Sequence, residues 1–254
     1  MRLFSFDMSK AVAVLSIAVL TIAVFPGPAA KADVLLLEDF EDESRTYSVS
    51  TPEFHDGTSD YFGIIPLLGA AVPVDPYTGF GGSSFFAIED MDDGGTRPDT
   101  GTISFAVNIS TFDNLSVDFK FATGGNGATT PSYDDEESFL VRASVDGGAF
   151  QNLIAFEAVE PGGDTTNNVI RQDTDFDGIG DGFLPSSAMT TFGGLSIAGT
   201  GTILVVEVIV TSSDGNSEFA FDDFQINGIS SVPEPSSAGL LGLVFLGVCL
   251  RRRR

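Results

Sequence analysis

Hydrophobic and polar residues alternate along much of the middle of the chain. Between residues 115 and 121 every second residue is apolar, and the residues between them are Ser116, Asp118 and Lys120. A β-strand that is buried on one face has this period of two. Residues 139–145 repeat the pattern. Asp146-Gly147-Gly148 then predicts a tight turn into a partner strand at 150–156, because glycine tolerates the positive φ that such a turn needs.

Other apolar runs predict further strands at residues 34–40, 85–90, 102–107, 195–198, 202–211 and 218–226. Residues 203–210 are almost all apolar, which indicates a central strand covered on both faces. No segment between residues 33 and 231 has helical periodicity. Eight to ten strands separated by turns predict an all-β fold, an antiparallel β-sandwich of the jelly-roll type, in which the first and last strands lie near each other.

Three predicted connections are longer than turns and cover residues 41–84, 123–137 and 158–188. Loops of this length are uncommon unless they bind something, so we expect functional residues there.

The N-terminal segment has the layout of a secretory signal peptide. Arg2 and Lys10 precede an apolar stretch over residues 11–25, which Pro26-Gly27-Pro28 ends. Ala30-Lys31-Ala32 then offers small residues at the cleavage positions, so cleavage is expected after Ala32. An uncleaved membrane anchor is the alternative, but the apolar stretch is shorter than the ~20 residues that a span needs.

The C-terminal segment combines Pro233-Glu234-Pro235, an apolar run over residues 238–250 and a basic cluster. The cluster consists of Arg251, Arg252, Arg253 and Arg254. The prolines separate the run from the preceding domain, and the arginines favour the cytoplasmic side of a membrane. We therefore expect a short hydrophobic sorting helix that anchors the chain transiently in the inner membrane.

This tail resembles the PEP-CTERM sorting signal of Gram-negative bacteria. The resemblance implies export by the secretion machinery, handling by an exosortase, and delivery to the cell surface or an extracellular polysaccharide matrix. The chain then divides into a signal peptide at residues 1–32, a β-sandwich domain at 33–231 and a sorting tail at 232–254. Cys249, the single cysteine, lies in the tail, so the domain has no internal disulfide.

The exported part of the chain is strongly acidic. Without Asp7 and the seven basic residues of the two ends, 35 acidic and 5 basic residues remain, a net charge of about −30. Such a surface repels nucleic acid, which excludes that class of partner, and it attracts divalent cations. A solvated acidic surface that keeps a secreted protein soluble is the simpler interpretation.

The third long connection contains the sharpest local motif. Its aspartates stand at positions 1, 3, 5 and 9 of a loop, with glycine at position 6: Asp173, Asp175, Asp177, Asp181 and Gly178. Calcium loops have this spacing, and the carbonyl of Ile179 at position 7 would be a further ligand. Leu184 replaces the glutamate of an EF-hand at position 12. The segment therefore resembles the aspartate-rich calcium repeats of secreted proteins, with a solvated acidic turn as the alternative.

A second acidic set lies in the predicted first and last strands and comprises Glu38, Asp39, Asp222 and Asp223. The segments around it, 37–41 and 219–224, resemble the edge strands of galactose-binding-like and MAM-like jelly rolls. That resemblance implies a second structural calcium site between the two strands. The alternative places these carboxylates on the outward face of edge strands, where charge discourages pairing with another chain.

Few features of the sequence indicate a catalytic function. His55 is the single histidine, and no nucleophile motif surrounds it. Paired carboxylates for glycan hydrolysis are available, for example at residues 134–137, but so acidic a chain makes this signal unspecific. Glycan binding would use exposed aromatic residues, and the first long connection supplies them: Tyr61, Phe62, Tyr77 and Phe80.

The sequence thus favours a non-catalytic, calcium-stabilised structural or adhesive protein of the cell surface or extracellular matrix. A lectin-like carbohydrate-binding module is the first alternative, and a divergent glycan hydrolase is the second.

Overall fold

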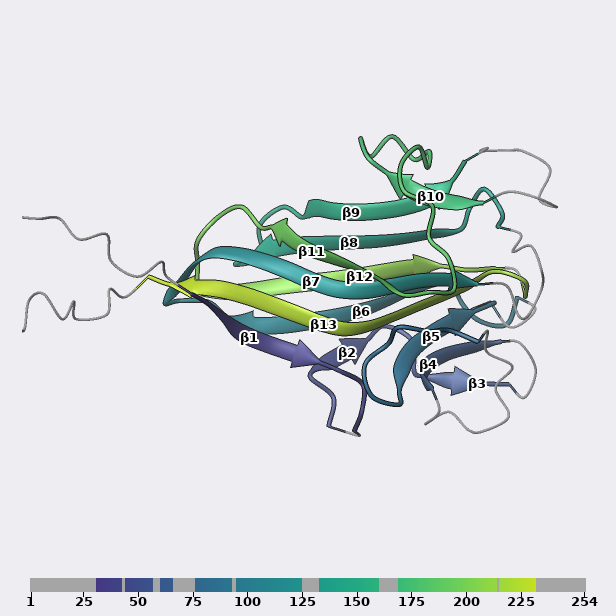
Figure 1. Cartoon of the computed structure of the whole chain (residues 1–254), viewed down its shortest axis with the longest axis horizontal. Coiled ribbons are helices and arrows are strands. Elements are labelled where there is room, and N and C mark those ends of the chain that lie inside the picture. Colours follow the sequence, from purple (N-terminus) through teal and green to yellow (C-terminus); the bar gives the residue numbers. More distant parts are fainter. Residues whose placement is uncertain are drawn as a thin grey trace, which may run out of the picture.

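The computed structural model describes residues 31–42, 44–56, 60–65, 76–92, 95–124, 133–159, 169–213 and 215–231. These residues form two packed antiparallel sheets, which confirms the predicted β-sandwich (Figure 1). No helix occurs among them, and thus none that could span a membrane. The predicted sorting helix, with Pro233-Glu234-Pro235 and the terminal arginines, lies outside the described residues.

The strands are, in chain order, β1 (Ala32–Glu38), β2 (Tyr47–Val49), β3 (Phe54–His55), β4 (Tyr61–Ile65), β5 (Phe85–Glu89), β6 (Thr100–Asn108), β7 (Phe112–Gly124), β8 (Ser138–Val145), β9 (Gln151–Ala158), β10 (Ile170–Asp173), β11 (Thr190–Ser196), β12 (Ile203–Thr211) and β13 (Glu218–Ser230). Sheet A has the order β11-β7-β13-β5-β4-β3, with β1 also paired to β13. Sheet B has the order β10-β9-β8-β12-β6-β2.

Strand β13 is the central strand of sheet A. One edge pairs with β7 along nearly its whole length. The other edge pairs first with β5, through residues 218–221, and then with β1, through residues 224–229. The first and last strands are therefore neighbours, as the sequence predicted. The start of β1 and the end of β13 lie together at one end of the molecule (Figure 1).

The predicted turn between β8 and β9 is present. Asp146 and Gly147 have φ values of 51° and 71°, and the amide of Gly148 donates to the carbonyl of Val145 at 2.9 Å. The Asp146 carboxylate also accepts hydrogen bonds from the amides of Thr202 and Ile203. This turn therefore holds the start of β12 in place as well as closing the hairpin.

Strand β12 occupies an inner position in sheet B, as predicted, but it is covered on one face only. Leu204, Val206, Val208 and Val210 are buried, whereas the residues between them are half-buried. The prediction of two covered faces was wrong because the outward valine and isoleucine side chains suit a strand whether or not another layer covers them. On that outer face Glu207 forms an ion pair with Arg142 of β8.

The sequence missed four short strands. β2, β3 and β4 lie in the connection predicted at 41–84, and β10 lies in the one predicted at 158–188. The strand predicted at 195–198 begins earlier, at Thr190, and contains a bulge between Phe192 and Leu195. Gly193 and Gly194 form this bulge, and their lack of side chains hid the strand pattern.

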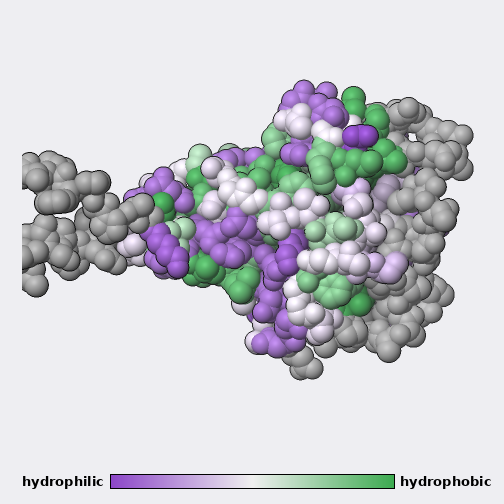
Figure 2. Space-filling model, viewed as in Figure 1, coloured by the Kyte–Doolittle hydropathy of each residue, from purple (hydrophilic) through white to green (hydrophobic). Residues whose placement is uncertain are grey.

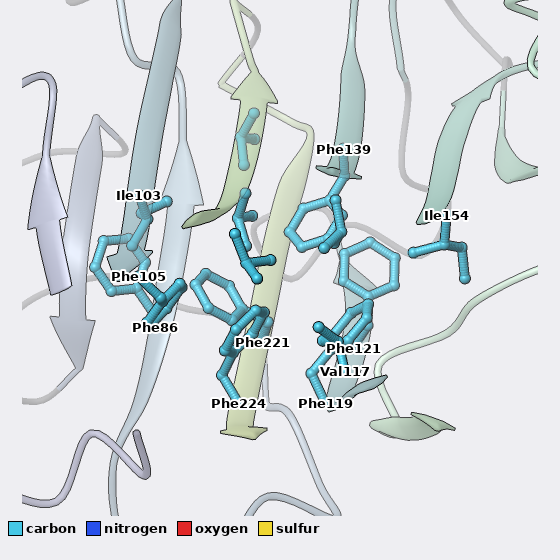
Figure 3. Packing of buried hydrophobic residues seen from close by; sticks show 14 of the residues in the cluster. Phe86, Ile103, Phe105, Val117, Phe119, Phe121, Phe139, Ile154, Phe221 and Phe224 are labelled. Atoms are coloured by element: carbon cyan, nitrogen blue, oxygen red, sulfur yellow. The ribbon is translucent and has the colours of Figure 1, made fainter. Parts of the chain in front are cut away.

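Phenylalanines from both sheets fill the core (Figure 3). Phe121 of β7 meets Phe139 of β8 and Phe156 of β9 with ring centroids 4.4 and 4.3 Å apart. Phe224 of β13 stacks on Phe105 of β6 at 4.1 Å. Such pairs add to the free energy gained by burying apolar area, so contacts between aromatic rings join the two sheets.

Replacing a central phenylalanine should destabilise the whole sandwich. Phe121→Ala removes a fully buried ring that contacts both sheets, so we expect a loss of about 3–5 kcal/mol in the free energy of unfolding. Urea denaturation measures this loss as a lower midpoint. Phe150→Ala, at a position 41% exposed, is the control and should lower the free energy of unfolding far less. Equal losses in the two variants would contradict the assignment of the core.

Candidate metal centre and surface groove

The aspartate loop leaves sheet B at the end of its edge strand β10. Asp173 is the last residue of that strand and is 2% exposed, whereas Asp175 and Asp177 are exposed. One carboxylate oxygen from each of the three lies within 4.8 Å of the other two. The structure thus brings together three of the carboxylates that the sequence singled out.

The loop is shaped by hydrogen bonds to Asp173. Its carboxylate accepts from the amides of Asp175, Phe176 and Gly178, at 3.2, 2.7 and 2.9 Å. Phe176 and Gly178 both have positive φ, 61° and 88°. Glycine adopts this conformation at little cost, and Phe176 adopts it because the surrounding bonds hold the turn.

The other two predicted ligands, Asp181 and the carbonyl of Ile179, are not part of this trio of side chains and stay predictions. Asp181 accepts hydrogen bonds from the amide and hydroxyl of Thr174, at 3.1 and 2.8 Å, and so closes the base of the loop. These bonds lower the pKa of Asp181. Ile179 donates its amide to Asp177 at 3.0 Å. Asp181 therefore has a structural role in this geometry.

The three converging carboxylates fit a hard cation. Calcium takes oxygen ligands at roughly 2.3–2.6 Å, so two of its ligands can be up to about 5 Å apart. The separation within the trio is compatible with that limit. The negative charge of Asp177, followed by burial and the charge of Asp173, raises the pKa of Asp175. A bound cation would relieve this repulsion.

The second acidic set holds loops to sheet A. Glu38 accepts from the amide of Phe40 at 3.1 Å and from the amide and hydroxyl of Thr46 at 2.9 and 2.8 Å. Asp39 accepts from the amide of Glu41 at 3.2 Å. Among the described residues, the trio of the aspartate loop is the one group that places three acidic ligand atoms within 4.8 Å. Calcium between β1 and β13 therefore stays a prediction.

Asp222 and Asp223 lie at a bulge in β13. Asp222 is fully buried and accepts from the amide of Gly81, and burial raises its pKa to about 6. Asp223 forms an ion pair with Lys120 at 2.7 Å. The alternative interpretation, outward-facing charges on edge strands, was wrong for Glu38, which is buried, and for Asp222 and Asp223, because β13 is a central strand of sheet A.

A groove crosses the outer face of sheet A, with a volume of about 570 Å³. Side chains from four adjacent strands line it: Leu37 of β1, Asp118 and Lys120 of β7, Thr191 of β11, and Asp223 and Gln225 of β13. Gly193 and Gly194 of the β11 bulge complete its wall. Figure 2 shows hydrophilic residues gathered over the middle of this face. The groove has no signature in the sequence because its residues are far apart along the chain.

Hydrogen bonds order the floor of the groove. The Asp118 carboxylate accepts from the amide of Gly194 and, at 2.7 Å, from the side chain of Asn227. Asn227 in turn accepts from the side chain of Gln225 at 2.5 Å. A Cβ atom on Gly193 would lie 2.8 Å from Asp118 Oδ1, so a larger residue at that position would displace the Asp118 carboxylate. The polar side chains of the groove are thus preorganised.

The residues predicted for catalysis and sugar stacking have other surroundings. His55 pairs with Tyr61 between β3 and β4. Tyr61 and Phe62 are fully buried and Tyr77 is 6% exposed, so the expectation of an exposed aromatic platform was wrong for these three. They are buried because β4 and residues 77–80 pack against other apolar residues of sheet A. Of residues 134–137, Glu137 is fully buried and accepts from the hydroxyl of Ser217.

Carboxyl groups also gather at the ends of β5 and β13. Glu89 and Glu218 are both fully buried and face each other in the register of the two strands. Next to them, Asp90 has a φ of 40°, and its amide donates to the hydroxyl of Ser212 at 3.1 Å. Burial, and then the charge of Asp60, raises the pKa of Asp90 to about 7. The folded state therefore favours the protonated form of Asp90 at this end of the sandwich.

Residues 231–254 match the PEP-CTERM protein-sorting motif. The match covers Pro233-Glu234-Pro235 and the four terminal arginines, and it confirms the resemblance seen in the sequence. This motif identifies an exported protein that an exosortase processes.

No curated protein matches the sequence of this chain. Several solved structures are similar over most of its length. The CBM22-1 xylan-binding domain of Xyn10C from Paenibacillus barcinonensis is 13% identical, covering 81% of this chain and 100% of its own, with a TM-score of 0.37. The K1 cleaved adhesin domain of Lys-gingipain from Porphyromonas gingivalis is 15% identical, covering 77% and 97%, with a TM-score of 0.39. Likeness at this level assigns no function.

The raised pKa of Asp90 predicts that the stability of the folded protein depends on pH. Because the folded value of about 7 exceeds the ordinary 3.8, the folded state binds the proton more tightly. Protonated Asp90 therefore contributes its full stabilisation of the folded state below about pH 4, and this contribution is lost as the pH rises through about 7. Asp90→Asn removes the charge and tolerates the positive φ, so it should raise the melting temperature at pH 8 by roughly 2–6 °C.

The gain in Asp90→Asn should shrink as the pH is lowered from 8 to 5, which thermal unfolding at both values measures. Asp113→Asn is the control and should show no such trend, because Asp113 pairs with Ile229 at the opposite end of β13 from Glu218. A gain in Asp90→Asn that is the same at both pH values would contradict the assignment.

Proposed function

We propose that this chain is a non-catalytic structural or adhesive protein of the cell surface or extracellular matrix, stabilised by calcium. In this proposal residues 1–32 are removed as a signal peptide, residues 33–231 act outside the cell, and residues 232–254 anchor the chain transiently in the inner membrane. The single observation that carries the proposal is the sorting motif that directly follows the β-sandwich.

The fold and the charge of the chain support this proposal. Because β1 pairs with β13, the points where both terminal segments join the domain lie at one end of the sandwich. The aspartate loop after β10 and the turn after β5 lie away from this end (Figure 1). A net charge of about −30 on the exported part suits a soluble extracellular protein, and it also concentrates divalent cations near the surface.

Calcium in the aspartate loop would have a structural role. Asp173, Asp175 and Asp177 would supply three oxygen ligands, and backbone carbonyls and water would supply the remainder. A cation that binds only the folded state stabilises it in proportion to the logarithm of its concentration. In this way calcium would replace the disulfides that the exported domain lacks.

Calcium should raise the melting temperature of the exported protein. At a concentration 100 times the dissociation constant the gain is about 2.7 kcal/mol, which corresponds to roughly 5–10 °C for a domain of this size. Differential scanning calorimetry with calcium and with a chelator measures the shift. Asp175→Ala should abolish it, whereas Asp113→Ala, outside the loop, should retain it. An equal midpoint in calcium and chelator would refute calcium stabilisation.

Binding of an extracellular polysaccharide is the second candidate function, and the groove on sheet A favours it. Ligand sites are typically hollows of roughly 300–1,000 Å³ with a few ordered polar groups, and the groove meets both criteria. A carbohydrate-binding role also agrees with delivery to a polysaccharide matrix. A glycan hydrolase remains the third candidate and has no site geometry in its favour among the described residues.

The exported protein should cosediment with at least one insoluble extracellular polysaccharide if the second candidate function is correct. Saturable binding that competing soluble polymer removes would support it, because a nonspecific acidic surface gives neither effect. Depletion of the protein from the supernatant measures binding, and bovine serum albumin, also acidic, is the control. Failure to bind any polymer would remove the second candidate function.

A further inference from the structure

We propose that the groove on sheet A binds a neutral, hydroxyl-rich polysaccharide segment that lies across β1, β13, β7 and β11. This assignment rests on the second candidate function and gives it a site and a ligand class. Four features of the groove carry the assignment: its direction, its polar groups, an exposed leucine beside them and its charge.

The groove runs across the strands rather than along one of them. Leu37, Gln225, Asp118 and Thr191 come from four neighbouring strands of sheet A. Adjacent strands are ~4.8 Å apart, so three steps between strands span about 14 Å. At the far wall, Gly193 and Gly194 present only backbone. An extended polymer segment can therefore lie across the sheet without meeting a side chain from the bulge.

The polar groups of the groove suit hydroxyl ligands. Lys120 is a donor, the carboxylates of Asp118 and Asp223 are acceptors, and the amide of Gln225 is both. Each is already oriented by a neighbour: Lys120 by Asp223, and Gln225 and Asp118 by Asn227. Carboxylate oxygens accept more than one hydrogen bond, so these contacts leave capacity for hydroxyl donors. Preorganised donors and acceptors lose little entropy when a ligand binds.

Leu37 supplies an apolar contact beside these polar groups. It is 48% exposed and lines the groove, where its partner in the register of β1 and β13 is Gln225. A sugar ring has hydroxyls around its edge and C–H groups on its faces. The arrangement of one exposed leucine next to amide, carboxylate and ammonium groups matches both parts of such a ring.

The charge of the groove excludes anionic polymers. Lys120 is its single basic residue, and its ammonium group is already paired with Asp223. Asp118 and Asp223 both line the groove, so two carboxylates stand against one ammonium group. A uronate or phosphate group would therefore meet more negative than positive charge, within a strongly acidic protein. A neutral polymer meets no such repulsion.

Two variants test the site without disturbing the core. Gln225→Ala removes the amide from the floor of the groove, and Lys120→Met removes the ammonium group while keeping the length of the side chain. Arg142→Met is the matched control, because it breaks a comparable ion pair, with Glu207, on the outer face of sheet B. Melting temperatures within about 3 °C of the original protein establish that each variant is folded.

Affinity electrophoresis of the exported protein and the variants, in gels that contain β-glucan, mannan, xylan, galactan or alginate, gives the decisive comparison. We expect a neutral polymer to retard the original protein, with affinity reduced about tenfold or more in each groove variant and unchanged in Arg142→Met. Full affinity in both groove variants would overturn the site but leave polysaccharide binding intact. Binding to alginate alone would overturn the neutral ligand class. Binding to no polymer would remove the second candidate function together with this proposal.

Discussion

The pairing of β13 with three other strands is the interaction on which the rest of the structure depends. β7 covers one edge, while β5 and β1 divide the other. Its inward phenylalanines, Phe219, Phe221 and Phe224, contact rings from both sheets. Its outward residues supply Asp223 and Gln225 to the groove. Core, sheet order and candidate binding face thus all depend on the alternation of side chains along one strand.

The bulge at Asp222 and Asp223 modifies that alternation and thereby sets the chemistry of the outer face. A regular strand would place two successive residues on opposite faces. Here Asp222 reaches the amide of Gly81, and Asp223 reaches the ammonium group of Lys120. Asp223 adopts a φ of 49°, which aspartate tolerates better than most residues. The bulge therefore connects the turn before β5 with the groove and places a carboxylate in each.

Local patterns in the sequence predicted much of this structure. Alternation at residues 115–121 and 139–145 identified β7 and β8, and the spacing of three aspartates identified the loop that follows β10. Strand β4 was missed because Tyr-Phe-Gly-Ile-Ile has no alternation: four of its five residues are buried, some under each face of the sheet. The groove could not be found in the sequence, since residues 37, 118–120, 191–194 and 223–225 meet only after the sheet has formed.

The adjacency of β1 and β13 also determines how the domain would respond to mechanical load. A protein held through its C-terminal tail transmits tension to Ser231 and then along β13. Because β13 is paired on both edges over residues 225–229, a pull along its axis loads several hydrogen bonds in parallel, in shear, rather than opening them one after another. Force entering at this end is therefore shared between β1 and β7 before it reaches the phenylalanine core.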